Sequence, residues 1–406
     1  MQILLMEPAL KYFIWAPLAL TGPDLVAAEN QLLEIQGSRI ASMQTVRKSD
    51  LPASVTDHPR FTCLAEGQTL MPALIDGHVH LALDGEDFKQ ARAAWDRPHA
   101  LEGRIRRALE EMTRSGIGAV RDGGDCRAIN LEARALVSEG RCKGPRIVAT
   151  GRAVREKGGY GTFLGPDYGS RESIPAVVEQ ALASGADQLK VVVSGVVSFI
   201  EYGLVKGLLM EPDSLRRLTA CARERGLKVM AHASSAEAVE MAIAAGVNSI
   251  EHGYFVNQAG LQGMAERQVA WVPTVIPVAV QAREPLSSLR TPLEIEVITA
   301  TCKGQAGKLT RALQLGVPLG AGTDSGAAGV GHAHSLIEEL LLYRAGGLSN
   351  RQVLKAATIA NAGILGLEKE YGQVERGYRA ALIAVRGNPL QDLNILKTVT
   401  FHALPR

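Results

Sequence analysis

Cysteine is scarce in this sequence and is nowhere clustered. The chain has 5 cysteines, which are widely scattered: Cys63, Cys126, Cys142, Cys221 and Cys302. An odd number of distant cysteines fits neither a zinc knuckle nor a disulfide framework. We therefore expect a protein of the reducing cytoplasm.

An excess of charge of either sign is also lacking. The 44 basic and 42 acidic residues leave a formal net charge of +2, without long runs of one sign. This balance gives no electrostatic reason to expect binding to nucleic acid or to an anionic membrane. We therefore predict a small-molecule substrate. The sequence leaves the oligomeric state open, and it allows a homo-oligomer.

Long apolar runs are missing as well. No run reaches the about 20 residues that are needed to span a bilayer. Residues 1–20 are apolar, but Glu7 and Lys11 interrupt them and no basic segment precedes them, so a signal peptide is not expected.

What the sequence does contain is a repeated alternation of apolar and amphipathic segments from residue 74 onward. Helical periodicity lies between most of the short apolar runs, for example over residues 100–115, 173–184, 212–226 and 237–245. The eight runs are residues 74–83, 118–122, 146–151, 188–195, 227–234, 249–254, 270–275 and 318–325. Eight βα units in one stretch favour a (β/α)8 TIM barrel over an open doubly wound sheet.

The two ends of the chain follow a different pattern. Residues 31–34 and 39–42 flank a Gln-Gly-Ser turn, which indicates a hairpin. Residues 374–385, followed by a Gly-Asn-Pro turn, also resemble strands. With a length of 406 residues, we predict a small β domain from residues 1–70 and 371–406 around a barrel of residues 71–370.

The first barrel strand carries His78 and His80, separated by one residue. Side chains at alternate positions of a strand point the same way, so both imidazoles can bind one metal ion. His232 and His252 follow near the ends of the fifth and sixth predicted strands. Catalytic groups of barrels come from the carboxyl ends of several strands, which favours a metal site over the alternative of ordinary partly buried histidines.

Two charged residues in apolar surroundings extend the candidate site. Asp324 follows the eighth run, and a metal would compensate its charge, although it could instead cap a following helix. Lys190 lies in the middle of the fourth run. It either pairs with an acid, extends past the end of the barrel, or loses its proton and takes up carbon dioxide to form a carbamate that bridges two cations.

The set of ligand residues resembles that of the binuclear amidohydrolases, and more narrowly their imidazolonepropionase-related and prolidase-like branch. The resemblance rests on residues 74–80, 231–233, 250–253, 322–325, 377–383 and 387–390 together with Lys190. It implies a barrel with a small β-sandwich built from both termini, a carboxylated Lys190, and hydrolysis of amide or ester bonds. The chain departs from the pattern of these relatives at two positions: Tyr160 in the loop at residues 158–161, and Ser234 after Ala233.

The mechanism that follows uses two divalent metal ions, with zinc expected. His78, His80 and Asp324 would hold one ion, His232 and His252 the other. The carbamate of Lys190 and a hydroxide would bridge the two ions, with Asp324 as the proton carrier.

Substrate contacts are predicted from the loops around the barrel mouth. Arg152 could clamp a carboxylate, with Tyr160 or Tyr254 touching the scissile group and His332 contributing from a Gly-rich loop. The predicted substrate is a carboxylate-bearing amide, such as an N-acyl amino acid or a dipeptide. Arg152 could alternatively pair with Glu156 and only order its loop.

Three other functions use the same residues. A mononuclear deaminase of heterocycles would need one metal and no bridging lysine, and a lactone or ester hydrolase would use the same metal pair. A catalytically silent relative would bind no metal. Metal content therefore separates the deaminase and the silent relative from the binuclear hydrolase.

Overall fold

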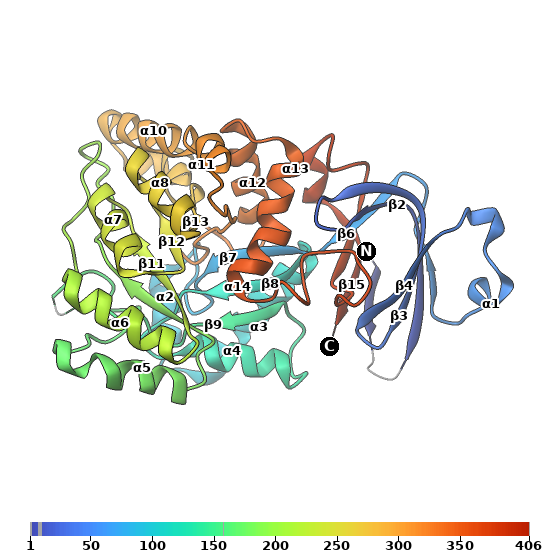
Figure 1. Ribbon diagram of the computed structural model, residues 1–406, viewed down its shortest axis with the longest axis horizontal. Coiled ribbons are helices and arrows are strands. Elements are labelled where there is room, and N and C mark those ends of the chain that lie inside the picture. Colours follow the sequence, from blue (N-terminus) through green and yellow to red (C-terminus); the bar gives the residue numbers. More distant parts are fainter. Residues whose placement is uncertain (1, 7–9, 157, 406) are drawn as a thin grey trace.

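The computed structural model describes residues 2–6, 10–156 and 158–405, and it divides into a strand-rich end and a larger α/β part (Figure 1). The strand-rich end takes its strands from both ends of the chain. In the order of their hydrogen bonding these are β1 (Gln2–Met6), β15 (Val399–Pro405), β14 (Leu382–Arg386), β6 (Gln68–Pro72), β2 (Lys11–Thr21), β3 (Val26–Gln36) and β4 (Arg39–Thr45), and β5 (Phe61–Cys63) also pairs with β2.

The predicted hairpin is confirmed as β3 and β4, which pair in antiparallel fashion around residues 37 and 38. The predicted sandwich is one continuous eight-stranded sheet. Its two halves share a hydrophobic core, in which Ile14 and Leu33 of one half lie in the same cluster as Leu382 and Phe401 of the other. Burial of this shared apolar surface holds the two ends of the chain together.

The larger part is TIM-barrel-like. Its strands are parallel and form two sheets, one of β7 (Leu74–Val79), β8 (Ile117–Asp122) and β9 (Arg146–Ala149), and one of β10 (Gln188–Val192), β11 (Lys228–Ala233), β12 (Ser249–His252) and β13 (Ala270–Val272). Seven of the eight predicted barrel runs therefore contain a strand. Every residue of these strands is buried, with two exceptions: Arg146 and the first residue of β11. Such burial is expected for a parallel sheet that is covered by helices.

Backbone hydrogen bonds join the two sheets on both sides. After β9, the amide of Val154 donates to Lys190 O at 2.7 Å. On the other side, Trp271 N donates to Pro318 O at 2.9 Å and Gly77 N donates to Ala321 O at 2.8 Å. Residues 318–325 thus connect β13 to β7 and occupy the place of an eighth strand.

The prediction of a regular eighth strand is wrong in one respect. Residues 318–325 form only isolated bridges, between Leu319 and Trp271 and between Ser325 and Val79. Asp324 has a φ of 55°, in the left-handed region, which a β-strand cannot accommodate. The backbone therefore leaves the strand conformation at the residue that carries the carboxylate.

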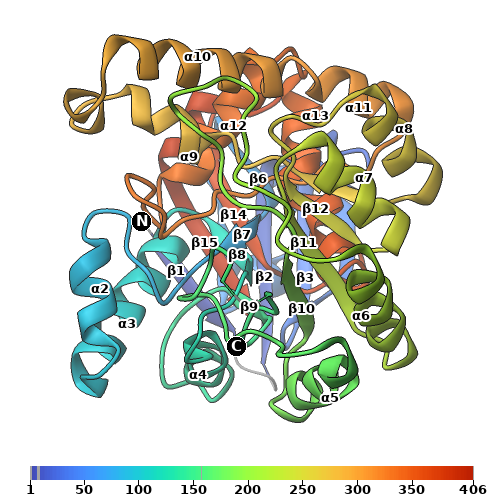
Figure 2. The same ribbon diagram turned by 90° about the vertical axis from the view of Figure 1, so that its left-hand side faces the viewer.

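Helices surround the strands, as Figure 2 shows in a view that is turned by 90° from that of Figure 1. The helices that follow the barrel strands in the chain are α3 (Pro98–Arg114), α4 (Ile129–Ser138), α5 (Ile174–Ala183), α6 (Pro212–Glu224), α7 (Ala236–Ala245), α8 (Gln258–Arg267), α10 (Pro292–Ala306), α11 (Leu309–Leu315) and α12 (Ser335–Ala345). Short helices include α1 (Ala53–Thr56), α2 (Phe88–Ala94), α9 (Ile276–Ala279), α13 (Asn350–Lys355) and α14 (Asn361–Leu365). Among the described residues, no helix is long and apolar enough to cross a membrane.

Candidate metal centre

A cavity of about 420 Å³ opens at the carboxyl ends of the barrel strands. All six predicted metal ligands line it: His78, His80, Lys190, His232, His252 and Asp324. We call these six side chains the cavity floor. The other lining residues, which we call the cavity wall, are Leu83, Phe88, Tyr160, Phe163, Leu164, Val196, Val197, Phe199, Ser234, Tyr254, Pro277, Val278, Ala327 and Ala328.

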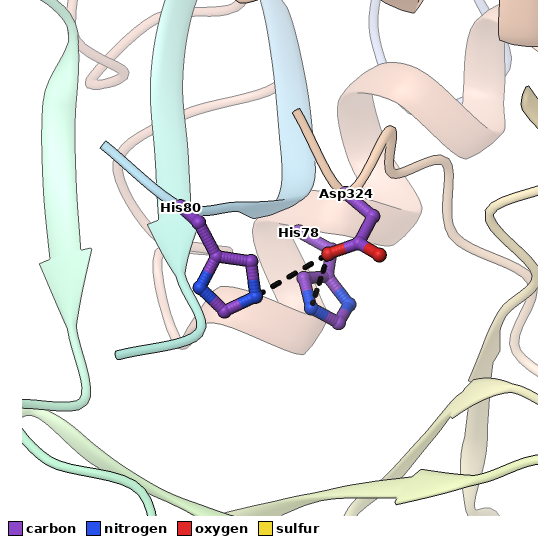
Figure 3. Close-up of side chains that lie close together, drawn as sticks. All are labelled: His78, His80 and Asp324. Carbon is purple, nitrogen blue, oxygen red and sulfur yellow. Dashed lines mark ion pairs between the residues drawn. The ribbon is translucent and has the colours of Figure 1, made fainter. Parts of the chain in front are cut away.

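Three of the floor residues form a compact group around one carboxylate oxygen (Figure 3). Oδ1 of Asp324 lies 3.5 Å from Nε2 of His78 and 3.3 Å from Nε2 of His80. The nearest ligand atoms of the three residues all lie within 4.8 Å of one another. Two imidazoles and a carboxylate at this spacing are suited to binding one divalent ion such as zinc.

The outer nitrogens of these two imidazoles have defined acceptors. Nδ1 of His78 lies 2.9 Å from Oε2 of Glu251, and Nδ1 of His80 lies 2.9 Å from Gly124 O. Each acceptor oxygen requires a proton on Nδ1, which leaves the lone pair of Nε2 directed at the cavity. A Cβ atom on Gly123 would come within 2.8 Å of the His80 ring, so only glycine leaves room for this imidazole.

His232 and His252 lie on the other side of the floor, with ring centroids 4.4 Å apart. Nε2 of His232 is 3.3 Å from Gly195 O, and Nδ1 of His252 is 2.7 Å from Oγ1 of Thr274. When these nitrogens donate, Nδ1 of His232 and Nε2 of His252 remain as lone-pair donors. The two histidines could therefore hold a second ion, and the metal pair stays a prediction.

Lys190 lines the same cavity as these two groups and is fully buried. Nζ contacts Nε2 of His78 at 3.2 Å, and an imidazole offers no opposite charge to the ammonium. Burial lowers the pKa of Lys190 to about 8, although the nearby carboxylates of Glu251 and Asp324 raise it in part. A lysine that loses its proton this readily is able to react with carbon dioxide, as the predicted carbamate requires.

The charges of the floor favour an ionised carboxylate and keep the imidazoles neutral except for that of His80, whose pKa the Asp324 carboxylate raises against the effect of burial. Burial and the charge of Lys190 lower the pKa of His78 to about 4 and that of His232 to about 3. Burial works against the charge of Asp324, but the surrounding histidines hold the pKa of its carboxyl well below its usual range. The next helix, α12, begins only at Ser335, so Asp324 does not act as its cap.

A buried ion pair beneath the floor was not predicted. Glu251 on β12 accepts from Nη2 of Arg121 on β8 at 2.8 Å and from Oγ of Ser249 at 2.5 Å, while its other oxygen contacts His78. Burial raises the pKa of Glu251, but the positive charge of Arg121 outweighs this effect, and the pKa lies at about 2. Two opposite charges within buried strands, Arg121 and Glu251, were the sequence signal for this pair.

Two of the predicted substrate contacts line the cavity. The Tyr160 ring centroid lies 5.8 Å from that of His232. The Tyr254 ring stacks on His252 at 5.7 Å, and its hydroxyl donates to Thr274 O at 3.1 Å. Tyr254 therefore presents its ring to the cavity, whereas Tyr160, which is 36% exposed, lies at the mouth.

The other two predicted contacts are not among the lining residues, and this corrects the sequence interpretation. Arg152 is exposed and lines a separate hollow of about 250 Å³ that also contacts α5, because the chain turns at Gly151, where φ is 69°. The ring nitrogens of His332 lie 2.9 Å from Oγ of Ser325 and 3.0 Å from Leu83 O. His332 therefore joins two loops of the barrel mouth.

The fold and the floor together define a class of protein: a TIM-barrel-like enzyme with imidazole, carboxylate and lysine side chains around one cavity, among them a His-His-Asp group that could hold a metal ion. The backbone around the cavity is strained, because His252, Thr274 and Asp324 all have positive φ angles. Strain of this kind clusters at functional sites and therefore supports one here.

The chain belongs to the amidohydrolase family, whose model matches residues 69–402. The predicted family and the prediction of a hydrolase are therefore confirmed. Among proteins of known name, the ochratoxinase of Aspergillus niger is 24% identical over 366 residues, which cover 81% of this chain and 72% of the relative. The imidazolonepropionase of Agrobacterium fabrum is 25% identical over 394 residues, covering 87% and 84%.

Solved structures show the same fold. A Xaa-Pro dipeptidase crystallised with methionine in its active site superimposes with a TM-score of 0.83 at 24% identity, covering 96% of this chain and 97% of the other. A prolidase complexed with N-methylphosphonate-L-proline gives 0.81 at 24% identity, covering 98% of both chains. These likenesses support a TIM-barrel-like α/β fold with a separate β domain.

Proposed function

We propose that this protein hydrolyses an amide C–N bond of a small molecule with two divalent metal ions, zinc being expected. The observation that carries the proposal is the convergence of four imidazoles, Lys190 and Asp324 on one cavity. Each imidazole has an outer partner that leaves one lone pair directed inward. This is the arrangement that metal ligands need.

His78, His80 and Asp324 would hold one ion, and His232 and His252 the second, with the carbamate of Lys190 between them. Bound metal would supply the acidity that turns water into a nucleophile at neutral pH and would polarise the scissile carbonyl. The site thus matches the divalent-metal chemistry of the family without requiring a ligand from outside the floor.

The residues of the chain then handle the proton. One oxygen of Asp324 pairs with the two histidines, and the dashed lines of Figure 3 do not join the other oxygen to either ring. That second oxygen can take the proton from the attacking water and pass it to the leaving nitrogen. Tyr160 and the ring of Tyr254 would position the substrate above the floor.

The names of the relatives support amide hydrolysis. One structural relative is a Xaa-Pro dipeptidase, whose substrate bond is an amide. Dipeptides and N-acyl amino acids are therefore the first substrates to test. A mononuclear deaminase would have no use for Lys190 beside a second pair of histidines.

Cytoplasmic location stays a prediction from the five free cysteines.

The test is hydrolysis of a panel of N-acyl amino acids, dipeptides, anilides, lactones and aminated heterocycles by protein purified without chelator. We expect turnover of amides that is abolished by a chelator and restored by added zinc. Turnover of lactones alone, or release of ammonia from heterocycles alone, would contradict the proposal.

A further inference from the structure

Among the residues that the structure describes, no charged side chain lines the cavity wall. Apart from the six floor residues, every lining residue is apolar, aromatic, or a neutral hydroxyl residue. Phe88, Phe163 and Phe199 supply much of the wall together with Val278. A carboxylate that lies against this wall, away from the floor, would therefore contact apolar side chains without a cation of the wall to compensate it, which is costly.

The guanidinium of Arg290 lies close to the wall and has partners for two of its three nitrogens, whereas its Nε has no hydrogen-bond partner among the described residues. Arg290 packs over the ring of Phe199, with its carbon Cζ 4.9 Å from the ring centroid. Nη2 donates to Oε1 of Gln281 at 2.6 Å, and Nη1 lies 3.7 Å from Oε1 of Glu294. Glu294 therefore offsets the charge of Arg290, and Arg290 does not line the cavity.

The wall also holds a buried hydroxyl without a protein partner. Ser234 follows the last residue of β11, lines the cavity, and is fully buried. Its backbone amide donates to Oγ of Ser194 at 2.9 Å, which fixes the position of the residue. Its own Oγ has no hydrogen-bond partner among the described residues. A buried hydroxyl of this kind needs a partner, and the cavity is where one can enter.

We propose that the substrate is an uncharged, hydrophobic amide and that Oγ of Ser234 forms a hydrogen bond with its polar group. The inference rests on the proposed function and narrows its substrate class. Apolar groups on the substrate would bury the phenylalanine wall, while Ser234 fixes the orientation of the amide above the floor. This replaces the carboxylate-bearing substrate expected from Arg152.

The first experiment compares two compounds that differ by one carboxylate. N-benzoylleucine and N-benzoyl-3-methylbutylamine have the same benzamide bond and the same branched chain. We expect kcat/KM of the zinc-loaded protein to favour the uncharged amide by at least about tenfold, the cost of leaving a charge without a partner. Equal values, or preference for the acid, would overturn the inference.

The outcome also separates the inference from the function on which it rests. Zinc-dependent hydrolysis of the acid alone would overturn the uncharged substrate but leave amide hydrolysis standing. Hydrolysis of neither compound would count against both. A rise of KM for the acid in Arg290→Met would show that Arg290 holds a carboxylate, which would also overturn the inference.

The second experiment removes the hydroxyl. Ser234→Ala should raise KM for the uncharged amide by about 3- to 10-fold, as expected for one lost hydrogen bond, with metal content unchanged. The matched control is Thr113→Val, which removes a buried hydroxyl that already donates to Leu109 O and does not line the cavity. The control should lower thermal stability without raising KM. An unchanged KM in Ser234→Ala would overturn the role of Ser234.

Discussion

The floor and the wall of the cavity differ in the chemistry of their side chains. Beneath and within the floor, the buried charges of Lys190, Glu251 and Arg121 and the partly buried charge of Asp324 compensate one another over short distances. The wall has no charged side chain. The difference indicates that the floor performs the chemistry, whereas the wall selects the substrate by shape and apolar contact. Changes in the floor should therefore alter kcat and metal content, and changes in the wall should alter KM.

The largest expected effect is that of Asp324→Asn. The amide keeps one oxygen for the metal but cannot carry the proton, so kcat should fall by about 10²- to 10⁴-fold. Metal content, measured in the same preparation, should be largely retained. A kcat within about threefold of the unmodified protein would remove Asp324 from proton transfer.

Glu251→Gln tests the ion pair beneath the floor. The variant weakens the acceptor for Nδ1 of His78 and leaves the buried charge of Arg121 without compensation. Metal affinity, measured by competition with a chelator, should fall by about 10- to 100-fold. The control is Glu339→Gln, because Glu339 is also buried but bonds to the amides of Val275 and Ile276. Equal losses in both variants would point to general destabilisation.

Phe163→Ala should affect the wall alone. Its ring packs edge-on against Phe88 and Tyr160, at 5.7 Å in each case. Removing it takes away apolar contact with a hydrophobic substrate, so KM should rise by about tenfold. Metal content and kcat should stay the same, and a loss of metal would break the division between floor and wall.

The smallest effect concerns the reloading of metal-free protein. With a pKa of about 8, Lys190 is mostly protonated at pH 7 and mostly neutral at pH 9. Only the neutral amine reacts with carbon dioxide, so reloading with zinc at a fixed concentration of dissolved carbon dioxide should be faster at pH 9 by a factor of about 10. Lys190→Met, which cannot form a carbamate, should show no such acceleration.

The floor was predictable from sequence because its four histidines lie at or next to the ends of barrel strands, and because the charges of Lys190 and Asp324 stand out within or after apolar runs. The pattern of apolar runs placed His78, His232 and His252 at one edge without knowledge of their distances. Asp324 was identified correctly as a lining residue, although its left-handed backbone replaces the predicted strand end.

The remaining features depend on contacts that a linear pattern does not contain. Arg121 and Glu251 meet across the barrel at a separation of 130 residues, so neither strand alone reveals their pairing. Arg152 and His332 lie in loops, where no periodicity determines the direction of a side chain. The apolar wall likewise comes from segments distant in the sequence, among them α2 and residues 160–164, 196–199 and 277–278.

The central claim is that the floor holds two metal ions bridged by Lys190. Elemental analysis of protein purified without chelators tests it most directly. We expect about two divalent ions per chain, and a loss of the metal pair in Lys190→Met. A content fixed near one ion that added zinc does not change, or full metal content in Lys190→Met, would contradict the account.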